Sequence, residues 1–160
     1  MIYNKEIIDK IKDSLCAKQL TVSVAESVTS GHLQAAFSSA KDASKFFQGG
    51  ITAYNAGQKC RHLNIEPIAG LANDCVSEKV ASEMSVNVNA LFISDYGIAI
   101  TGYASKAPEK GIEKLYAYVA ISRKDELLLT RKLNTAKEGI EAQVDYTNQV
   151  LKEFAQLLLQ

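Results

Sequence analysis

The chain has 160 residues, of which 47% are hydrophobic and 22% are charged, and eighteen basic residues balance eighteen acidic ones. This composition is typical of one globular domain and excludes intrinsic disorder, and the neutral balance argues against a general nucleic-acid binder. No apolar run reaches the roughly 18 residues of a membrane-spanning helix, and the N-terminus lacks the pattern of a signal peptide. We therefore expect a single domain over residues 1–160 that is cytoplasmic and has neither a nucleic-acid nor a membrane partner.

Cysteine and histidine are few and widely spaced. Cys16, Cys60 and Cys75 form no CxxC pair, and the two histidines, His32 and His62, lie near no cluster of metal-ligand type. This pattern argues against a structural zinc site and predicts reduced, packed thiols. With only two histidines, a Ser-His-Asp triad is not favoured, so a nucleophile in this chain would need a base other than histidine.

Hydrophobic periodicity and turn residues divide the chain into alternating helices and strands. Ser27, Thr29 and Ser30 are candidate caps for the second helix, and Gly49-Gly50 is expected to separate it from the next strand. In chain order, the patterns predict a helix over 3–18, a strand over 20–25, a helix over 33–40, a strand over 51–54, a short helix over 55–63, a helix after the N-cap Ser77, a strand over 96–101, strands over 115–122 and 127–133, and a final helix over 140–158.

Apolar residues at helical spacing predict which faces of the last two helices are buried. The list for the helix after Ser77 is Val80, Met84, Val88 and Leu91, and the list for the final helix is Ile140, Val144, Val150, Leu151, Phe154 and Leu158.

The order of these elements predicts the fold class. Strands interleaved with helices indicate an α/β protein, here a three-layer α/β/α sandwich. The continuous apolar run 96–101 suits a central strand that is buried on both faces. The short charged turn 123–126 between the last two strands predicts an antiparallel hairpin, so the sheet is expected to be mixed and mostly parallel. The order of the strands does not follow from these patterns.

The first candidate for chemistry is the segment Ala25–Gly31, between a predicted strand and a predicted helix. Backbone N–H groups at a helix N-terminus can bind an anion or stabilise an oxyanion. The alternative is simple capping of the helix by Thr29 or Ser30. Glu26 is a candidate general acid or base, or a side chain that fixes the loop by hydrogen bonding.

Two further segments follow predicted strands and are expected at the same edge of the sheet. Tyr54 ends a predicted strand, and Lys59 follows in the short helix, where a depressed pKa would let it act as a base. Thr101 and Gly102 end the buried strand. The alternatives are that Tyr54 only packs at the strand boundary, that Lys59 is a solvated surface charge, and that Gly102 forms an ordinary turn. The loop 106–110 is predicted to be a solvated surface loop, and the alternative is that it forms a lid.

Taken together, these segments resemble the CinA C-terminal domain family, which includes nicotinamide mononucleotide deamidases. The resemblance covers nearly the whole chain in order, and no single motif carries it. The matching positions are Ala25–Gly31, Phe46-Phe47, Gly49-Gly50, Tyr54, Lys59, Val76–Glu78 and Thr101-Gly102.

The resemblance implies an amidohydrolase of pyridine nucleotide salvage that converts nicotinamide mononucleotide and water to nicotinate mononucleotide and ammonia, with no cofactor and no metal. Ser27 would attack the carboxamide, Lys59 would take the Ser27 proton, Tyr54 would relay it, and N–H groups of residues 28–31 would stabilise the oxyanion. The residues expected to bind substrate are Glu26, Thr29, Ser30, Gly31, Gly50, Thr101, Gly102 and Lys137.

The chain departs from the family pattern in three segments. Val28 and Ser30 replace a cysteine and a glycine, residues 103–108 replace a glycine-rich loop, and Lys137 and Glu141 replace two arginines. A glutamate in place of an arginine would repel a phosphate. The alternative function is therefore a divergent, non-catalytic module that binds a nucleotide or a protein partner, since the family also occurs within larger competence/damage-inducible proteins. Family analogy also makes a homo-oligomer a candidate state.

Overall fold

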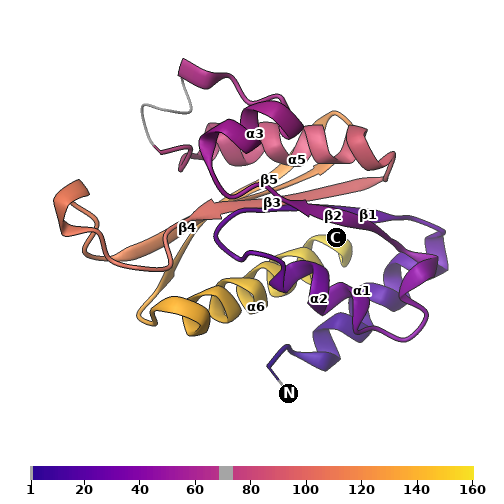
Figure 1. Cartoon of the computed structure of the whole chain (residues 1–160). Coiled ribbons are helices and arrows are strands. Elements are labelled where there is room, and N and C mark those ends of the chain that lie inside the picture. The colour runs from indigo at the N-terminus through magenta and orange to yellow at the C-terminus, as the bar shows by residue number, and fades with distance from the viewer. Residues whose placement is uncertain (1, 69–73) are drawn as a thin grey trace.

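The computed structural model describes residues 2–68 and 74–160, which form a five-stranded sheet between two layers of helices (Figure 1). The elements are α1 (Lys5–Lys18), β1 (Val22–Glu26), α2 (His32–Ser38), the 3-10 turn η1 (Ala43–Lys45), β2 (Phe47–Thr52), α3 (Ala56–Leu63), α5 (Glu78–Phe92), β3 (Tyr96–Gly102), the 3-10 turn η2 (Pro108–Lys110), β4 (Leu115–Arg123), β5 (Glu126–Thr135) and α6 (Gly139–Leu158).

The sheet is mixed, as expected, and its strand order is β2-β1-β3-β4-β5. The strands β2, β1 and β3 are parallel neighbours, whereas β4 runs antiparallel to both β3 and β5. Glu26 at the end of β1 pairs with Thr52 on one side and with Ile100 on the other. The chain therefore leaves β1, β2 and β3 at the same edge of the sheet.

The two faces of the sheet are covered by different helices, which confirms the three-layer sandwich (Figure 1). Val24 and Ile98 belong to the core shared with α1, α2 and α6, whereas their neighbours Ala25 and Ala99 belong to the core under α3 and α5. This alternation follows from the two-residue period of a strand.

Helix α5 packs closely on the sheet because small residues lie beneath it. A Cβ atom at Gly97 would collide with the Ser85 carbonyl oxygen, so only glycine fits there. The predicted N-cap is confirmed, since the Ser77 Oγ accepts a hydrogen bond of 3.1 Å from the Val80 N–H. The start of α5 is thereby fixed near the carboxyl edge of the sheet.

The predicted bounds of the second strand were wrong. The strand is Phe47–Thr52, and Gly49 and Gly50 lie within it rather than before it. A Cβ atom at Gly50 would lie 2.6 Å from Val24 Cγ2, so this glycine allows β2 and its neighbours to pack closely and does not mark a turn. Tyr54 therefore lies beyond the end of the strand.

Two residues expected in the core are exposed. Leu91 in α5 is 53% exposed and Ile140 in α6 is 71% exposed. Both lie in a terminal turn of a helix, where helical spacing alone does not decide whether another element covers the side chain. The other positions expected on these helices are buried, apart from the half-buried Val144.

None of the helices in the described ranges is both long and apolar enough to cross a membrane.

Candidate active site

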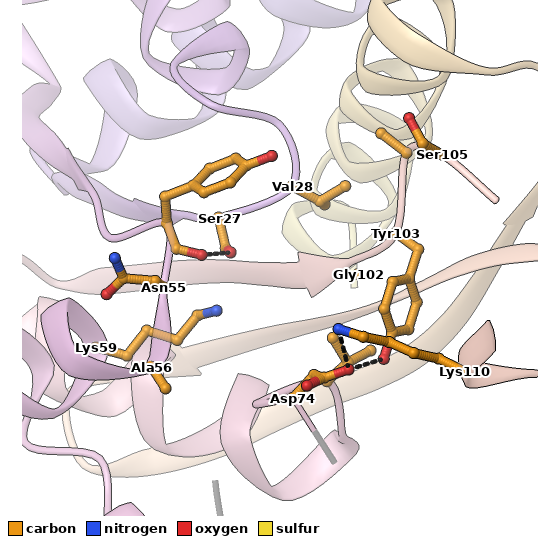
Figure 2. Close-up of a pocket in the computed structure, with 13 residues that line it drawn as sticks. Ser27, Val28, Asn55, Ala56, Lys59, Asp74, Gly102, Tyr103, Ser105 and Lys110 are labelled. Carbon is orange, nitrogen blue, oxygen red and sulfur yellow. Dashed lines mark hydrogen bonds and ion pairs between the residues drawn. The ribbon is translucent and has the colours of Figure 1, made fainter. Parts of the chain in front are cut away.

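A cavity of about 420 Å³ opens where the chain leaves β1, β2 and β3 (Figure 2). Its volume lies within the range of small-molecule sites, and its position at the carboxyl edge of a parallel sheet is where such sites form. It is lined by Ser27, Val28, Tyr54, Asn55, Ala56, Lys59, Asp74, Val76, Gly102, Tyr103, Ala104, Ser105 and Lys110.

The cavity brings together the three residues expected to be catalytic. Ser27 and Lys59 are 5% and 2% exposed, whereas Tyr54 is 67% exposed. Of the residues expected to bind substrate, Gly102 also lines the cavity. Those that do not line it are Glu26, Thr29, Ser30, Gly31, Gly50, Thr101 and Lys137.

Ser27 is held at the end of β1 by its backbone. Its N–H donates a hydrogen bond of 3.1 Å to the Ile100 carbonyl of β3. Its Oγ donates a longer hydrogen bond of 3.4 Å to the Tyr54 carbonyl, drawn as a dashed line in Figure 2. The backbone therefore fixes the position of Ser27, and the hydroxyl is held only by a weak contact.

Lys59 extends from α3 into the cavity towards Ser27 (Figure 2). The helix that carries it begins at Asn55, whose side chain accepts a hydrogen bond of 3.0 Å from the Gln58 N–H. Within residues 2–68 and 74–160, the Lys59 ammonium makes no hydrogen bond or ion pair. Burial lowers the pKa of Lys59, although the nearby Cys75 and Asp74 act in the opposite direction. A lowered pKa increases the neutral fraction that can accept a proton.

The N-terminus of α2 is capped by Glu26, not by the predicted hydroxyl residues. The fully buried Glu26 carboxylate accepts hydrogen bonds from the Thr29 hydroxyl at 2.6 Å and from the backbone N–H groups of Leu33 and Gln34 at 2.8 and 2.9 Å. The residue in the cap position is Gly31, which contributes no side-chain bond. The N–H groups of Leu33 and Gln34 are therefore paired with a carboxylate of the chain and are not free to bind an anion.

Part of the expected oxyanion site remains available. The Ser30 N–H donates to the Ser27 carbonyl at 3.1 Å, so it is taken by the turn. In the described part of the chain, the N–H groups of Val28 and Thr29 donate to no acceptor. Val28 itself lines the cavity beside Ser27.

A polar group on the wall of the cavity was missed at the level of sequence. Asp74 Oδ2 accepts hydrogen bonds from the Tyr103 hydroxyl at 3.3 Å and from the Lys110 ammonium at 3.2 Å. Burial, reinforced by the Asp74 carboxylate, raises the pKa of Tyr103 to about 12. Thr101 supports this wall, because its hydroxyl donates a bond of 2.7 Å to the Cys75 carbonyl. The sequence pointed to this region through the departure of residues 103–108 from the family pattern and through the lid alternative for the loop 106–110, but neither signal singled out Asp74.

The two residues at the positions of the family's arginines do not line the cavity. Lys137 Nζ lies 3.8 Å from Asp145 Oδ1 and belongs to a separate surface depression with Lys106 and Glu138. Glu141 is exposed in the first turn of α6, where a negative charge favours the helix dipole. Glu141 therefore does not oppose a ligand in the cavity of this chain.

Among the described residues, no group of three or more histidine, cysteine or acidic side chains is suited to hold a metal ion. Cys75 is buried and Cys16 and Cys60 are half-buried, and all three are free thiols.

The fold and the cavity define a three-layer α/β protein with a cavity of about 420 Å³ at the carboxyl edge of its parallel strands. The family model for the CinA C-terminal domain matches residues 4–158, and the chain belongs to this family. The chain is 38% identical over 151 residues to protein MG115 of Mycoplasma genitalium, a match that covers 92% of this chain and 94% of the relative. It is 31% identical to a CinA-like protein of Chlorobium chlorochromatii, where the match covers 92% of this chain and 36% of the relative.

Solved structures of the family have the same fold. The competence damage-inducible protein A of Klebsiella pneumoniae superposes with a TM-score of 0.93 at 23% identity, covering 99% of this chain and 98% of that one. A CinA superfamily protein of Escherichia coli superposes with a TM-score of 0.88 at 27% identity, and the match covers 100% of this chain and 91% of that one. The chain spans about a third of the length of longer CinA-like relatives such as the Chlorobium protein, whereas it spans nearly all of the Mycoplasma one.

Proposed function

We propose that this protein is a cytoplasmic amidohydrolase similar to nicotinamide-nucleotide amidase, which converts nicotinamide mononucleotide and water to nicotinate mononucleotide and ammonia. The observation that supports this function best is that the Ser27 hydroxyl and the buried Lys59 amine, which has no partner among the described residues, open into one cavity. A serine beside a neutral lysine is a nucleophile with its base, and it requires neither histidine nor metal.

In the first half of the reaction, the Ser27 Oγ attacks the carboxamide carbon while neutral Lys59 takes the hydroxyl proton. The N–H groups of Val28 and Thr29 are the donors available to the developing oxyanion, and such a donor contributes about 3–4 kcal/mol. The C–N bond then breaks, and the proton held by Lys59 passes to the departing ammonia, with Tyr54 assisting the transfer. The product of this half is an acyl-enzyme on Ser27.

In the second half, water attacks the acyl carbon and transfers a proton to Lys59. Collapse of the tetrahedral intermediate passes the proton from Lys59 to the Ser27 oxygen and releases the carboxylic acid, which loses its own proton to solvent and leaves as the carboxylate. Ser27 and Lys59 thereby return to their starting protonation states, and the reaction requires no cofactor.

One observation favours the alternative of a non-catalytic binding module. The Ser27 hydroxyl donates to the Tyr54 carbonyl rather than to Lys59. The amidase mechanism therefore requires a rotation of the Ser27 side chain towards Lys59 when substrate binds, which is a change between ordinary rotamers. Catalytic hydrogen bonds often tighten only in the substrate complex.

The test is ammonia release from nicotinamide mononucleotide by the purified protein, with nicotinate mononucleotide identified by chromatography. We expect turnover that Ser27→Ala and Lys59→Met each reduce by about 10³-fold or more. Ser38→Ala and Lys79→Met are the matched controls, because both residues lie outside the cavity; they should retain wild-type turnover. A folded wild-type protein that binds the nucleotide without releasing ammonia would overturn the amidase and favour the binding module.

A further inference from the structure

The amidase mechanism uses only one side of the cavity. Asp74, Tyr103 and Lys110 line the side of the cavity across from Ser27 and Lys59 (Figure 2). They come from two separate segments, one before α5 and one between β3 and β4. A substrate whose amide reaches Ser27 would place its remaining atoms against this group, which we call the distal wall.

The distal wall has open positions for both a donor and an acceptor. Asp74 Oδ2 accepts from Tyr103 and Lys110, whereas Asp74 Oδ1 makes no hydrogen bond within the described residues. The Lys110 ammonium has three N–H groups and gives one of them to Asp74. Tyr103 stays protonated at neutral pH, since burial and Asp74 raise its pKa to about 12. It therefore remains a donor that holds the carboxylate in place.

The charges of the distal wall discriminate between ligand groups. A phosphate placed here would meet the Asp74 carboxylate, and a cation would meet the Lys110 ammonium, so each would gain from one residue and lose to the other. A neutral hydroxyl does not incur this cost, because it can donate to a carboxylate and accept from an ammonium at the same time. Two adjacent hydroxyls match an adjacent carboxylate and ammonium.

We propose that Asp74 and Lys110 bind the vicinal diol of a sugar attached to the amide, with one hydroxyl donating to Asp74 Oδ1 and the other accepting from Lys110 Nζ. The substrate class is then a ribosylated carboxamide, and its phosphate is not what this chain selects. The choice of amide rests on the proposed function, whereas the recognition of a diol rests on the distal wall.

The test compares three pyridinium carboxamides that differ in one group at a time. The compound 1-methylnicotinamide has the charged ring with a methyl group, nicotinamide riboside has ribose with its vicinal diol in place of the methyl group, and nicotinamide mononucleotide adds the 5′-phosphate. We expect kcat/KM to rise by about 10-fold or more from the methyl compound to the riboside, since hydrogen bonds to charged groups are strong. From the riboside to the mononucleotide we expect a change of less than about 3-fold. A rise that occurs only when the phosphate is added would overturn the proposal.

Variants of the distal wall show whether these residues produce the preference. Asp74→Asn suits the backbone, because Asp74 has φ +52° and asparagine tolerates the left-handed region. Asp74→Asn and Lys110→Met should each remove most of the difference between the riboside and 1-methylnicotinamide, measured as the ratio of their kcat/KM values. Lys106→Met is the matched control, because Lys106 lies on the same loop but pairs with Glu138 outside the cavity. An equal loss on all three compounds would overturn the proposal.

Calorimetric binding separates this proposal from the proposed function. If the wild type turns over no amide but binds the riboside about 10-fold more tightly than the methyl compound, and Asp74→Asn removes that difference, the amidase is wrong and diol recognition stands. If the protein releases ammonia from all three compounds with equal efficiency, the amidase stands and diol recognition is wrong.

Discussion

The two sides of the cavity are built in different ways. On the side of Ser27, the fully buried Glu26 carboxylate and the backbone of β1 and β3 fix the chain through contacts away from solvent. On the distal wall, the side chains of Lys110 and Asp74 are 55% and 47% exposed and hold each other through an ion pair. Exposed pairs contribute little to stability. The comparison indicates that the chemical side is tied to folding, whereas the distal side can change without loss of the fold.

Glu26→Ala tests the buried side and should have the largest effect on stability. The substitution leaves the N–H groups of Leu33 and Gln34 and the Thr29 hydroxyl without their acceptor. We expect the free energy of unfolding to fall by about 3 kcal/mol or more and turnover to fall with it, because the Ser27 turn loses its support. Urea denaturation measures the first effect, and Glu113→Ala, at an exposed position, is the control. A loss below about 1 kcal/mol would contradict the role of Glu26.

Lys59→Met separates function from stability on the same side. Lys59 is buried and has no hydrogen-bond or ion-pair partner among residues 2–68 and 74–160. Burial of such an ammonium destabilises the fold, so an apolar side chain of similar length should raise the free energy of unfolding, on the order of 1 kcal/mol. Turnover should be lost at the same time. Thermal unfolding and ammonia release measure the two effects, and a destabilised variant would show that Lys59 has a stabilising partner.

The stability gained by Lys59→Met should depend on pH. Because burial lowers the pKa of Lys59, the unfolded chain binds more protons than the folded one between that lowered pKa and the ordinary value of 10.5. Stability of the wild type therefore rises with pH in this window relative to the variant. The advantage of Lys59→Met should be greatest at neutral pH and shrink towards pH 10.5, as measured by urea denaturation of both proteins. A difference that does not change with pH would show that the Lys59 pKa is the same in both states.

Glu141→Arg tests a position outside both sides of the cavity. A positive charge in the first turn of α6 opposes the helix dipole, so we expect a loss of about 0.3–1 kcal/mol in stability. Turnover of nicotinamide mononucleotide should not change, because Glu141 does not line the cavity. Kinetics of the two proteins on this substrate provide the measurement. Improved turnover by the arginine would show that Glu141 faces the phosphate after all.

The smallest effect on stability is expected at the distal wall. Asp74→Asn and Lys110→Met remove an exposed ion pair, and each should change the free energy of unfolding by less than about 0.5 kcal/mol. Thermal unfolding of these variants beside Glu26→Ala compares the two sides of the cavity directly. A loss at the distal wall as large as that of Glu26→Ala would remove the distinction between them.

The sequence by itself determined the order of helices and strands and identified the motif residues that line the cavity. The three-layer sandwich, the terminal hairpin and the Ser77 cap are confirmed because periodicity and capping act over a few residues. Ser27, Tyr54 and Lys59 line one cavity because each follows a strand that ends at the same edge. Their catalytic roles stay a prediction.

Tertiary structure decided what depends on which segments meet. Helical periodicity did not predict that Leu91 and Ile140 are exposed. The spacing of apolar residues along a helix does not show how far the elements packed against that helix extend. Sequence left several candidate caps for α2, and packing selected the buried Glu26 because its carboxylate can satisfy several donors at once. Asp74 and Lys110 are 36 residues apart, and only the fold brings them together, so no local pattern contains the distal wall.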